Sequence, residues 1–242
     1  MIYNFNNLPS NDNLNDYSYS IAVTKEMFIR RGKMIAYYGN LKFEALGSSI
    51  SATLVRSAFN APSYVSDFVI VTGQGKLILG DNARNIAAYN LEDGNLTVKS
   101  SRVLAFEPTL ICQECTLPGY LTLLGTGTFL ASSNGPVHFM EPPVRVDEQA
   151  LLGWVDLPCP SYYYDYQYVQ GVIGAIGAGL GITSSQEEKQ VNFVGQGTVL
   201  VQSSELGEPS SALQRVLMNI PGLSSLDLEN VLGSINSRLG RQ

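Results

Sequence analysis

The sequence predicts an all-β protein in which one strand motif occurs three times, followed by a short helical tail. Two blocks of apolar residues recur in the same order three times, and Tyr, Val, Ile, Thr and Phe, which favour strands, dominate both blocks. Helix-like spacing of apolar residues is found mainly at the C-terminal end. We therefore expect a polar N-terminal arm over 1–19, a three-repeat β domain over 20–204 and a helical tail over 205–242.

The two ends of the chain differ in composition from the middle. Asn, Asp and Ser are frequent in the first twenty residues, which predicts a solvated arm or an irregular lead-in. Near the other end, Ser210 or Ser211 is suited to cap a short helix that Pro221 would stop. Ser224 or Ser225 is suited to cap a second helix with an apolar face, and this tail is expected to cover part of the β domain.

The first recurring block reads apolar-x-apolar, then four residues, then apolar-apolar-small-aromatic. Its copies are residues 27–37, 96–106 and 144–154, and the spacing within the block is the same in all three. The four-residue centres, 30–33, 99–102 and 147–150, are mostly polar and predict hairpin loops between two strands.

The second block is an alternating strand, a Gly-x-Gly and another alternating strand. Its copies are 69–79, 121–131 and 191–201, and each is followed by a short polar residue, Asp81, Ser133 or Ser203. The repeats so defined cover about 20–82, 96–134 and 144–204. One such unit has too little apolar surface to be stable alone, so the three are expected to pack around a shared core.

The Gly-x-Gly pairs raise the question of a phosphate-binding loop. Such a loop needs a third glycine and a helix N-terminus behind it. Here Ile78, Leu130 and Leu200 occupy the third position, and a strand follows. We therefore interpret the pairs as bulges or as close crossings of two backbones.

Composition and charge narrow the classes of function. Of the 242 residues, 45% are hydrophobic and only 15% are charged, and a surface with so few charges favours self-association into homo-oligomers. The net charge is −6 and no run of Lys or Arg exceeds Arg30 and Arg31, which argues against nucleic acid as a partner.

The sequence also predicts the cellular location of the protein. The longest apolar stretch, 169–183, falls short of the roughly 20 residues that span a bilayer. The N-terminus has neither a basic region nor an apolar one, so no signal peptide or transmembrane segment is expected. Three cysteines, an odd number, suit a reducing compartment. The expected location is the cytoplasm.

Three cysteines and the single histidine are the candidate metal ligands. Cys112, Cys115, Cys159 and His138 together supply the ligand types of a tetrahedral zinc site. However, there is only one C-x-x-C pair, and buried or incidental thiols explain the same residues. No nucleophile elbow or phosphate-binding lysine motif occurs, and we expect no cofactor and no catalysis.

An aromatic cluster in the third repeat is the candidate interaction surface. Dense tyrosines supply contact area at low entropic cost, although alternate rings of a strand can also be buried in a core. The glycine-rich segment 171–181 that follows is expected to pack at a subunit interface or against the tail, and the alternative is contact with a membrane surface. The candidate residues are Trp154, Tyr162, Tyr163, Tyr164, Tyr166 and Tyr168.

Three segments resemble a known family. Residues 27–38 (MFIRRGKMIAYY), 103–108 (VLAFEP) and 195–203 (GQGTVLVQS) are similar to the altered inheritance of mitochondria family of uncharacterised β proteins, and the likeness covers about 20–205. The resemblance implies a fold like that of the trp RNA-binding attenuation protein, a double-stranded β-helix or jelly-roll-like sandwich. It implies a scaffold role in eukaryotic members and supplies no catalytic residues.

Three functions remain open on the sequence. The first is a non-catalytic oligomeric scaffold or binding protein with an unknown protein partner. The second, by analogy of fold, is an RNA- or small-ligand-binding protein, although the acidic balance opposes RNA. The third is a metal-dependent β-fold enzyme that uses the four candidate ligands.

Overall fold

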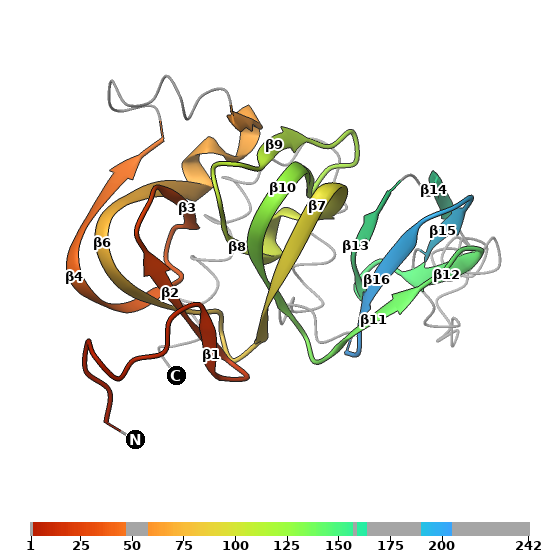
Figure 1. Cartoon of the computed structure of the whole chain (residues 1–242). Helices are drawn as coiled ribbons and strands as arrows, with labels where there is room; N and C mark the ends of the chain where they lie inside the picture. The colour runs from red at the N-terminus through yellow and green to blue at the C-terminus, as the bar shows by residue number, and fades with distance from the viewer. Residues whose placement is uncertain (1, 47–57, 157–158, 164–189, 205–242) are drawn as a thin grey trace, which may run out of the picture. The chain divides into compact units, whose positions relative to one another are not determined.

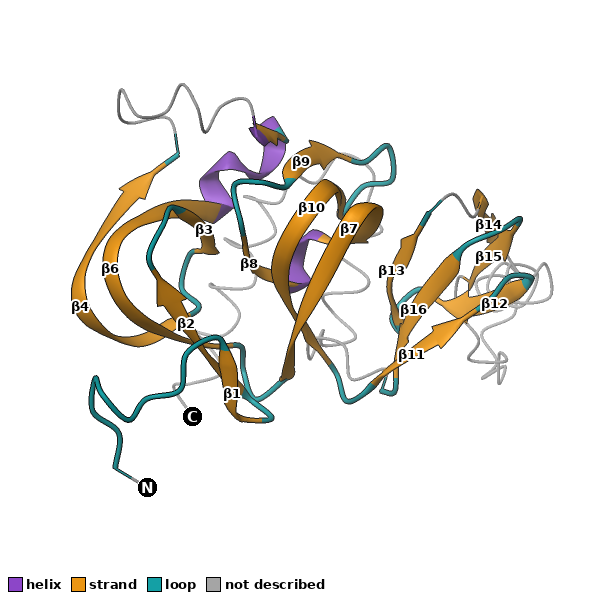
Figure 2. Cartoon of the chain, viewed as in Figure 1, coloured by secondary structure: helices purple, strands orange, loops and turns teal. Residues whose placement is uncertain are grey.

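The computed structural model describes residues 2–46, 58–156, 159–163 and 190–204. All of these belong to the first of the two units into which the chain divides, Met1–Glu205 and Leu206–Gln242. Most of the described residues lie in β-strands, which confirms the all-β class (Figure 2). Their helical content comprises two short 3-10 helices, η1 (Pro62–Asp67) and η2 (Ser100–Arg102). The predicted tail helices lie outside the described residues.

A first strand group, residues 18–80, is built around the long strand β6 (Phe68–Gly80). Strand β4 (Met34–Ala45) pairs along one edge of β6, while β2 (Ser18–Val23) and β3 (Met27–Arg30) share its other edge (Figure 1). All these pairings are antiparallel. Two short strands complete this part of the chain, β1 (Asp12–Asn15) and β5 (Phe59–Asn60).

A second strand group, residues 85–133, is also built around one long strand, but its uninterrupted partner lies on the edge that β2 and β3 share in the first group. The long strand β10 (Tyr120–Ser133) pairs along one edge with β7 (Asn85–Lys99). The other edge of β10 is shared by β8 (Val103–Phe106) and β9 (Ile111–Glu114) (Figure 1).

In a third strand group, residues 137–202, the long strands are divided. Strands β15 (Gln190–Val194) and β16 (Thr198–Gln202) take the place of one long strand. They pair on one side with β12 (Val144–Asp147) and β11 (Val137–Met140). On the other side they pair with β14 (Cys159–Tyr163) and β13 (Leu151–Val155).

The pairing registers of the three strand groups coincide residue by residue. On one edge, the first residue of the second block always faces the third residue of the first block. On the other edge, the aromatic residue of the first block always faces the same position of the long strand, and the pairing shifts by one residue next to it. The facing pairs are Val69 with Ile29, Leu121 with Val98 and Val191 with Val146, then Leu77 with Tyr37, Phe129 with Phe106 and Val199 with Trp154.

The prediction of hairpin loops at 30–33, 99–102 and 147–150 is wrong. In the first two strand groups, the strands that flank the segment pair with opposite edges of one long strand, and in the third they pair with β15 and β16, which replace it. None of the flanking strands pairs with the strand across its own loop. The physical reason is that the strand formed by the second block has two edges, so both short strands can pair with it, one on each side.

The interpretation of the glycine pairs as bulges or close crossings is confirmed. A Cβ added at Gly73 would overlap the carbonyl oxygen of Asn40 on β4, and the pairing of β10 with β7 shifts between Gly125 and Gly127. Gly73 and Gly125 also have positive φ values of 112° and 106°, which disfavour other residues. These glycines let the long strands bend while they remain paired.

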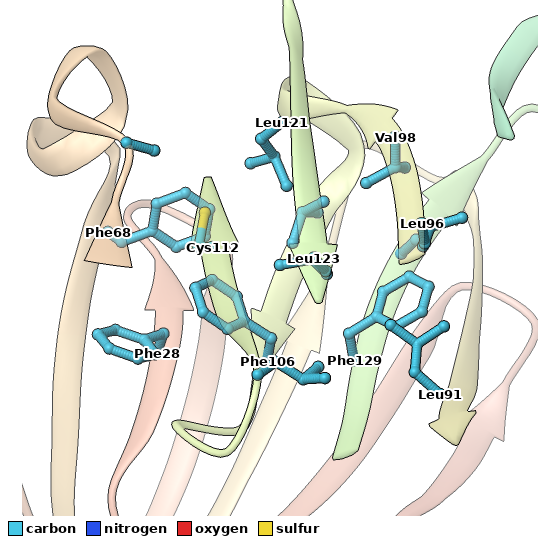
Figure 3. Close-up of a cluster of buried hydrophobic side chains, with 14 of the residues drawn as sticks. Phe28, Phe68, Leu91, Leu96, Val98, Phe106, Cys112, Leu121, Leu123 and Phe129 are labelled. Carbon is cyan, nitrogen blue, oxygen red and sulfur yellow. The ribbon is translucent and has the colours of Figure 1, made fainter. Parts of the chain in front are cut away.

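In the part of the chain that the structure describes, the buried apolar side chains form three clusters. The largest lies between the first and second strand groups, where the rings of Phe28 and Phe106 stack with their centroids 4.7 Å apart (Figure 3). A second cluster surrounds Leu77 and Leu104. The third surrounds Trp154, with Tyr120 at 5.2 Å from its ring. Each cluster is lined by residues of the two recurring blocks.

The N-terminal arm is more ordered than predicted. Residues 1–19 contain β1 and the beginning of β2, and Leu8 is buried. Side chains of Asn4 and Asn7 accept backbone N–H groups nearby, so the polar residues build local turns. These turns bring Leu8 against the β domain, where the free energy of apolar burial stabilises the arm.

Candidate interaction surface

Strand β4 has an exposed apolar surface at positions that are buried elsewhere in the molecule. Met34, Ile35 and Tyr37 are 43%, 62% and 46% exposed. The corresponding residues of β8, which are Val103, Leu104 and Phe106, are 0% exposed, and those of β13, which are Leu151, Leu152 and Trp154, are at most 6% exposed. The same sequence pattern is therefore covered twice and left open once.

The cover on β8 and β13 comes from a strand of the neighbouring group. Strand β3 pairs with β8, with Phe28 opposite Phe106. Strand β7 pairs with β13, with Thr97 opposite Trp154. Phe28 and Thr97 hold the same position in the first block, so the two junctions between strand groups are built alike. Among the described strands, β4 pairs only with β6.

Each junction is also held by a cation at the end of its covering strand. The guanidinium of Arg30 donates to the carbonyl oxygens of Ser100 and of Val103, the latter at 2.8 Å. The ammonium of Lys99 donates to the carbonyl oxygens of Glu148 at 2.6 Å and Gln149 at 3.3 Å. Ser100 and Glu148 hold the same position in the first recurring block, so the two cations bind the main chain of the neighbouring strand group at matching places.

Burial of Lys99 lowers the pKa of its ammonium to about 8, and the nearby Arg102 acts in the same direction. Because this pKa lies below the ordinary value of about 10.4, the folded protein releases the proton at a pH where the unfolded chain still holds it. Stability contributed by this group therefore rises between about pH 8 and pH 10.

We expect Lys99→Met to abolish that contribution, so that the variant gains less stability than wild type between the two pH values, while the raised pKa of Cys112 acts in the opposite direction in both chains. The measurement is the urea midpoint of the reduced protein at pH 7.5 and pH 9.5, compared between wild type and variant. Lys42→Met, which removes an exposed lysine, serves as the control and is expected to keep the rise. An equal rise in the Lys99 variant would contradict the assignment.

A buried carboxylate links the first strand group to the second. The side chain of Asp81 is 0% exposed and pairs with Lys33 at 2.6 Å and Arg84 at 3.4 Å. Ser132 donates its hydroxyl hydrogen to the same carboxylate. Burial alone would raise the pKa of Asp81, but the hydrogen bonds from Lys33 and Ser132 and the two cations outweigh it and lower the pKa.

A cavity of about 960 Å³ opens between the first and second strand groups. Its lining is mixed in charge, with Lys25, Glu26 and Glu107 beside the apolar Met27 and Leu130. Glu107 is held in place because its carboxylate accepts the N–H of Thr128 at 2.8 Å. A space of this volume accommodates a small polar molecule.

The four candidate metal ligands are not brought together by the described part of the chain. Cys112 is buried in the largest core cluster, where burial raises the pKa of its thiol to about 12. His138 is exposed on β11, with Nε2 at 3.1 Å from the hydroxyl of Ser203. The described residues contain no group of three or more His, Cys, Asp or Glu that could hold a metal ion. Cys115 is half-buried, and the side chain of Cys159 lies outside the description.

The aromatic candidates are placed in different surroundings. Trp154 is 6% exposed and packs between Tyr120 and Phe193, so its ring belongs to the core. The backbones of Tyr162 and Tyr163 on β14 pair with β15, while their side chains are outside the description. Tyr164, Tyr166 and Tyr168 and the segment 171–181 lie outside the described residues.

Sequence reasoning missed the exposed strand β4. Residues 34–37 have the same pattern as 103–106 and 151–154, and a pattern shows which side chains are apolar but not which neighbour covers them. The sequence did contain one usable signal, since the cations Arg30 and Lys99 both directly follow the apolar-x-apolar residues of the first recurring block.

Comparison with known proteins gives a family and a fold. A family model described as mitochondrial biogenesis AIM24 matches residues 17–204. The crystal structure of a Streptococcus pyogenes protein from a structural genomics programme is similar, with a TM-score of 0.59 and 19% sequence identity over 85% of this chain and 97% of that one. No curated protein matches the sequence. Within the described residues, no helix has the length and apolar character needed to cross a membrane.

Proposed function

The chain belongs to the mitochondrial biogenesis AIM24 family, and from this premise we propose that it is a non-catalytic scaffold or binding protein that acts as a homo-oligomer in the cytoplasm. The observation that carries the proposal is the exposed apolar edge of β4, at positions that are covered in both other strand groups. Leaving apolar side chains in water is unfavourable in free energy, so a partner that covers them is favoured.

We further infer that the three strand groups are copies of one unit. The coincident registers support this inference, since three unrelated segments would not share two edges and one bulge position. The unit corresponds to the double-stranded β-helix, or jelly-roll-like sandwich, of the trp RNA-binding attenuation protein that the family resemblance implies. In this proposal the tail 205–242 is an accessory segment.

Self-association is tested by light scattering on the full chain over a range of concentrations. We expect masses at multiples of the 26.3 kDa chain, and we expect Ile35→Glu to shift the population toward 26.3 kDa because a charge then lies on the exposed edge. Ile111→Glu, which changes a 40% exposed isoleucine on β9, is the matched control and should leave the mass unchanged. A wild-type chain that stays at 26.3 kDa at every concentration would contradict the proposal.

A second candidate function is the binding of a small polar ligand, favoured by the cavity between the first two strand groups. A thermal-shift screen of small polar metabolites tests it, and a ligand of this cavity should lose its effect in Glu107→Gln. Binding of RNA has less support than binding of a small ligand, because the net charge of the chain is −6.

The metal-dependent enzyme is the third candidate and has the least support. It needs Cys112 as a ligand, but a thiol buried in the apolar core stays protonated and cannot bind zinc well. Elemental analysis of the purified protein tests it directly.

A further inference from the structure

We propose that strand β12 of one copy pairs with β4 of a second copy, with Arg145 opposite Tyr37 and Val146 opposite Ala36. This inference rests on the self-association proposed above and specifies its geometry. The association is head-to-tail, because the two edges that meet lie on different strand groups of the chain.

The register follows from the two junctions inside the chain. At the first junction Phe28 lies opposite Phe106, and Ile29 lies opposite Ala105. At the second, Thr97 lies opposite Trp154, and Val98 lies opposite Gly153. These are the same positions of the recurring block. The covering strand of the third group is β12, and the strand left to be covered is β4, so the same rule gives the proposed pairs.

Both edges have the exposure expected of a separated junction. On β12, Arg145 is exposed, whereas the equivalent Phe28 and Thr97 on the covering strands are buried. Among the described strands, β12 pairs only with β15. Unpaired strand edges are the usual template for adding a strand from another chain.

The side chains that would meet are chemically matched. Arg145 would lie over Tyr37, and an arginine stacked on an aromatic ring is a favourable pair. At the end of β12 stands Asp147, in place of the cations Arg30 and Lys99. The turn that it would reach carries Arg31, which is exposed, in place of Ser100 and Glu148. At this junction a carboxylate would therefore face a guanidinium, where the internal junctions have a cation on main-chain carbonyl oxygens.

A second copy is the occupant that this geometry selects. One covering strand and one uncovered strand on each chain form a heterologous pair, which repeats from chain to chain and closes into a ring if the rotation allows. The register rule does not apply to an unrelated partner, whereas every copy of this chain carries the required strand.

Disulfide trapping tests the register. Full-length chains carrying Cys115→Ser and Cys159→Ser are made with either Tyr37→Cys or Arg145→Cys, mixed and oxidised mildly. Facing residues on antiparallel strands lie close enough for a disulfide. We expect a covalent dimer of twice 26.3 kDa in this mixture. The control mixture combines Tyr37→Cys with Asn192→Cys, which faces Arg145 from β15 and is one strand farther away.

The outcomes separate this inference from the proposed function. A dimer in the first mixture but not in the control supports the head-to-tail register. An oligomer by light scattering with no such dimer, or with Tyr37→Cys cross-linked to itself, overturns the register and leaves the scaffold proposal standing. A Tyr37→Cys and Arg145→Cys double variant that cross-links only within one chain also overturns it, because β12 would then cover β4 of the same copy.

Discussion

Asp81→Asn is expected to lower the free energy of unfolding by about 3 kcal/mol, because removing one partner of a buried ion pair leaves the others uncompensated. The Asp81 side chain is fully buried and receives Lys33, Arg84 and Ser132. The two cations are 21% and 14% exposed, so water relieves them in part and the loss stays near the lower end of the range for buried pairs. Urea unfolding at pH 7 measures the change.

A second carboxylate provides the control. Asp67 pairs with Arg30 at 3.1 Å, but its side chain is 39% exposed. Solvent screens such a pair, so Asp67→Asn is expected to cost less than about 1 kcal/mol. Equal losses in the two variants would mean that the buried position of Asp81 does not decide its contribution.

The pH dependence of stability gives the same assignment a second test. The folded pKa of Asp81 lies below its ordinary value, so the unfolded chain binds a proton first as the pH falls. Stability from this group is fully present above about pH 5 and is lost on acidification toward the folded pKa. Wild type should therefore lose more stability than Asp81→Asn between about pH 5 and pH 3. Parallel acid profiles would show that this carboxylate does not account for the acid sensitivity.

Asp81 also shows which features of the structure can be predicted from a single sequence and which cannot. Its recurrent place after the second block, shared with Ser133 and Ser203, could be read directly. Its partners Lys33 and Ser132 stand 48 and 51 residues away, and no local pattern connects them. The recurring spacing was therefore enough to find the strands, while the ion cluster depends on contacts between strand groups.

The distinction between local patterns and contacts between distant segments also explains where the structure differs from the other predictions. The blocks predicted strands at 27–29, 96–98 and 144–146 because alternation of apolar residues is a local property. The choice of neighbour is not local, so the predicted hairpins were replaced by pairing with a long strand. Tryptophan is a residue type that is common at binding surfaces, but Trp154 is buried in the core, as Phe106 is.

The aromatic position of the first recurring block offers a matched comparison across the three strand groups. Phe106→Ala is expected to cost about 3–5 kcal/mol, the usual range for removing a buried aromatic side chain. Its ring is fully buried, lies 4.7 Å from Phe28 and meets Phe68 edge-on at 5.5 Å, so truncation leaves a cavity. Trp154→Ala is expected to fall in the same range of about 3–5 kcal/mol. Urea unfolding of dilute protein measures both.

Tyr37→Ala tests whether the third position really lacks a partner within its own chain. Tyr37 is 46% exposed, with Phe43 as its aromatic neighbour at 5.4 Å. In dilute protein we expect a loss below about 1 kcal/mol, as for most substitutions of exposed residues. At concentrations where chains associate, the same variant should lose stability relative to wild type, because wild type is then stabilised by binding. A large loss at every concentration would show that a segment of the same chain covers β4, and self-association through this edge would be excluded.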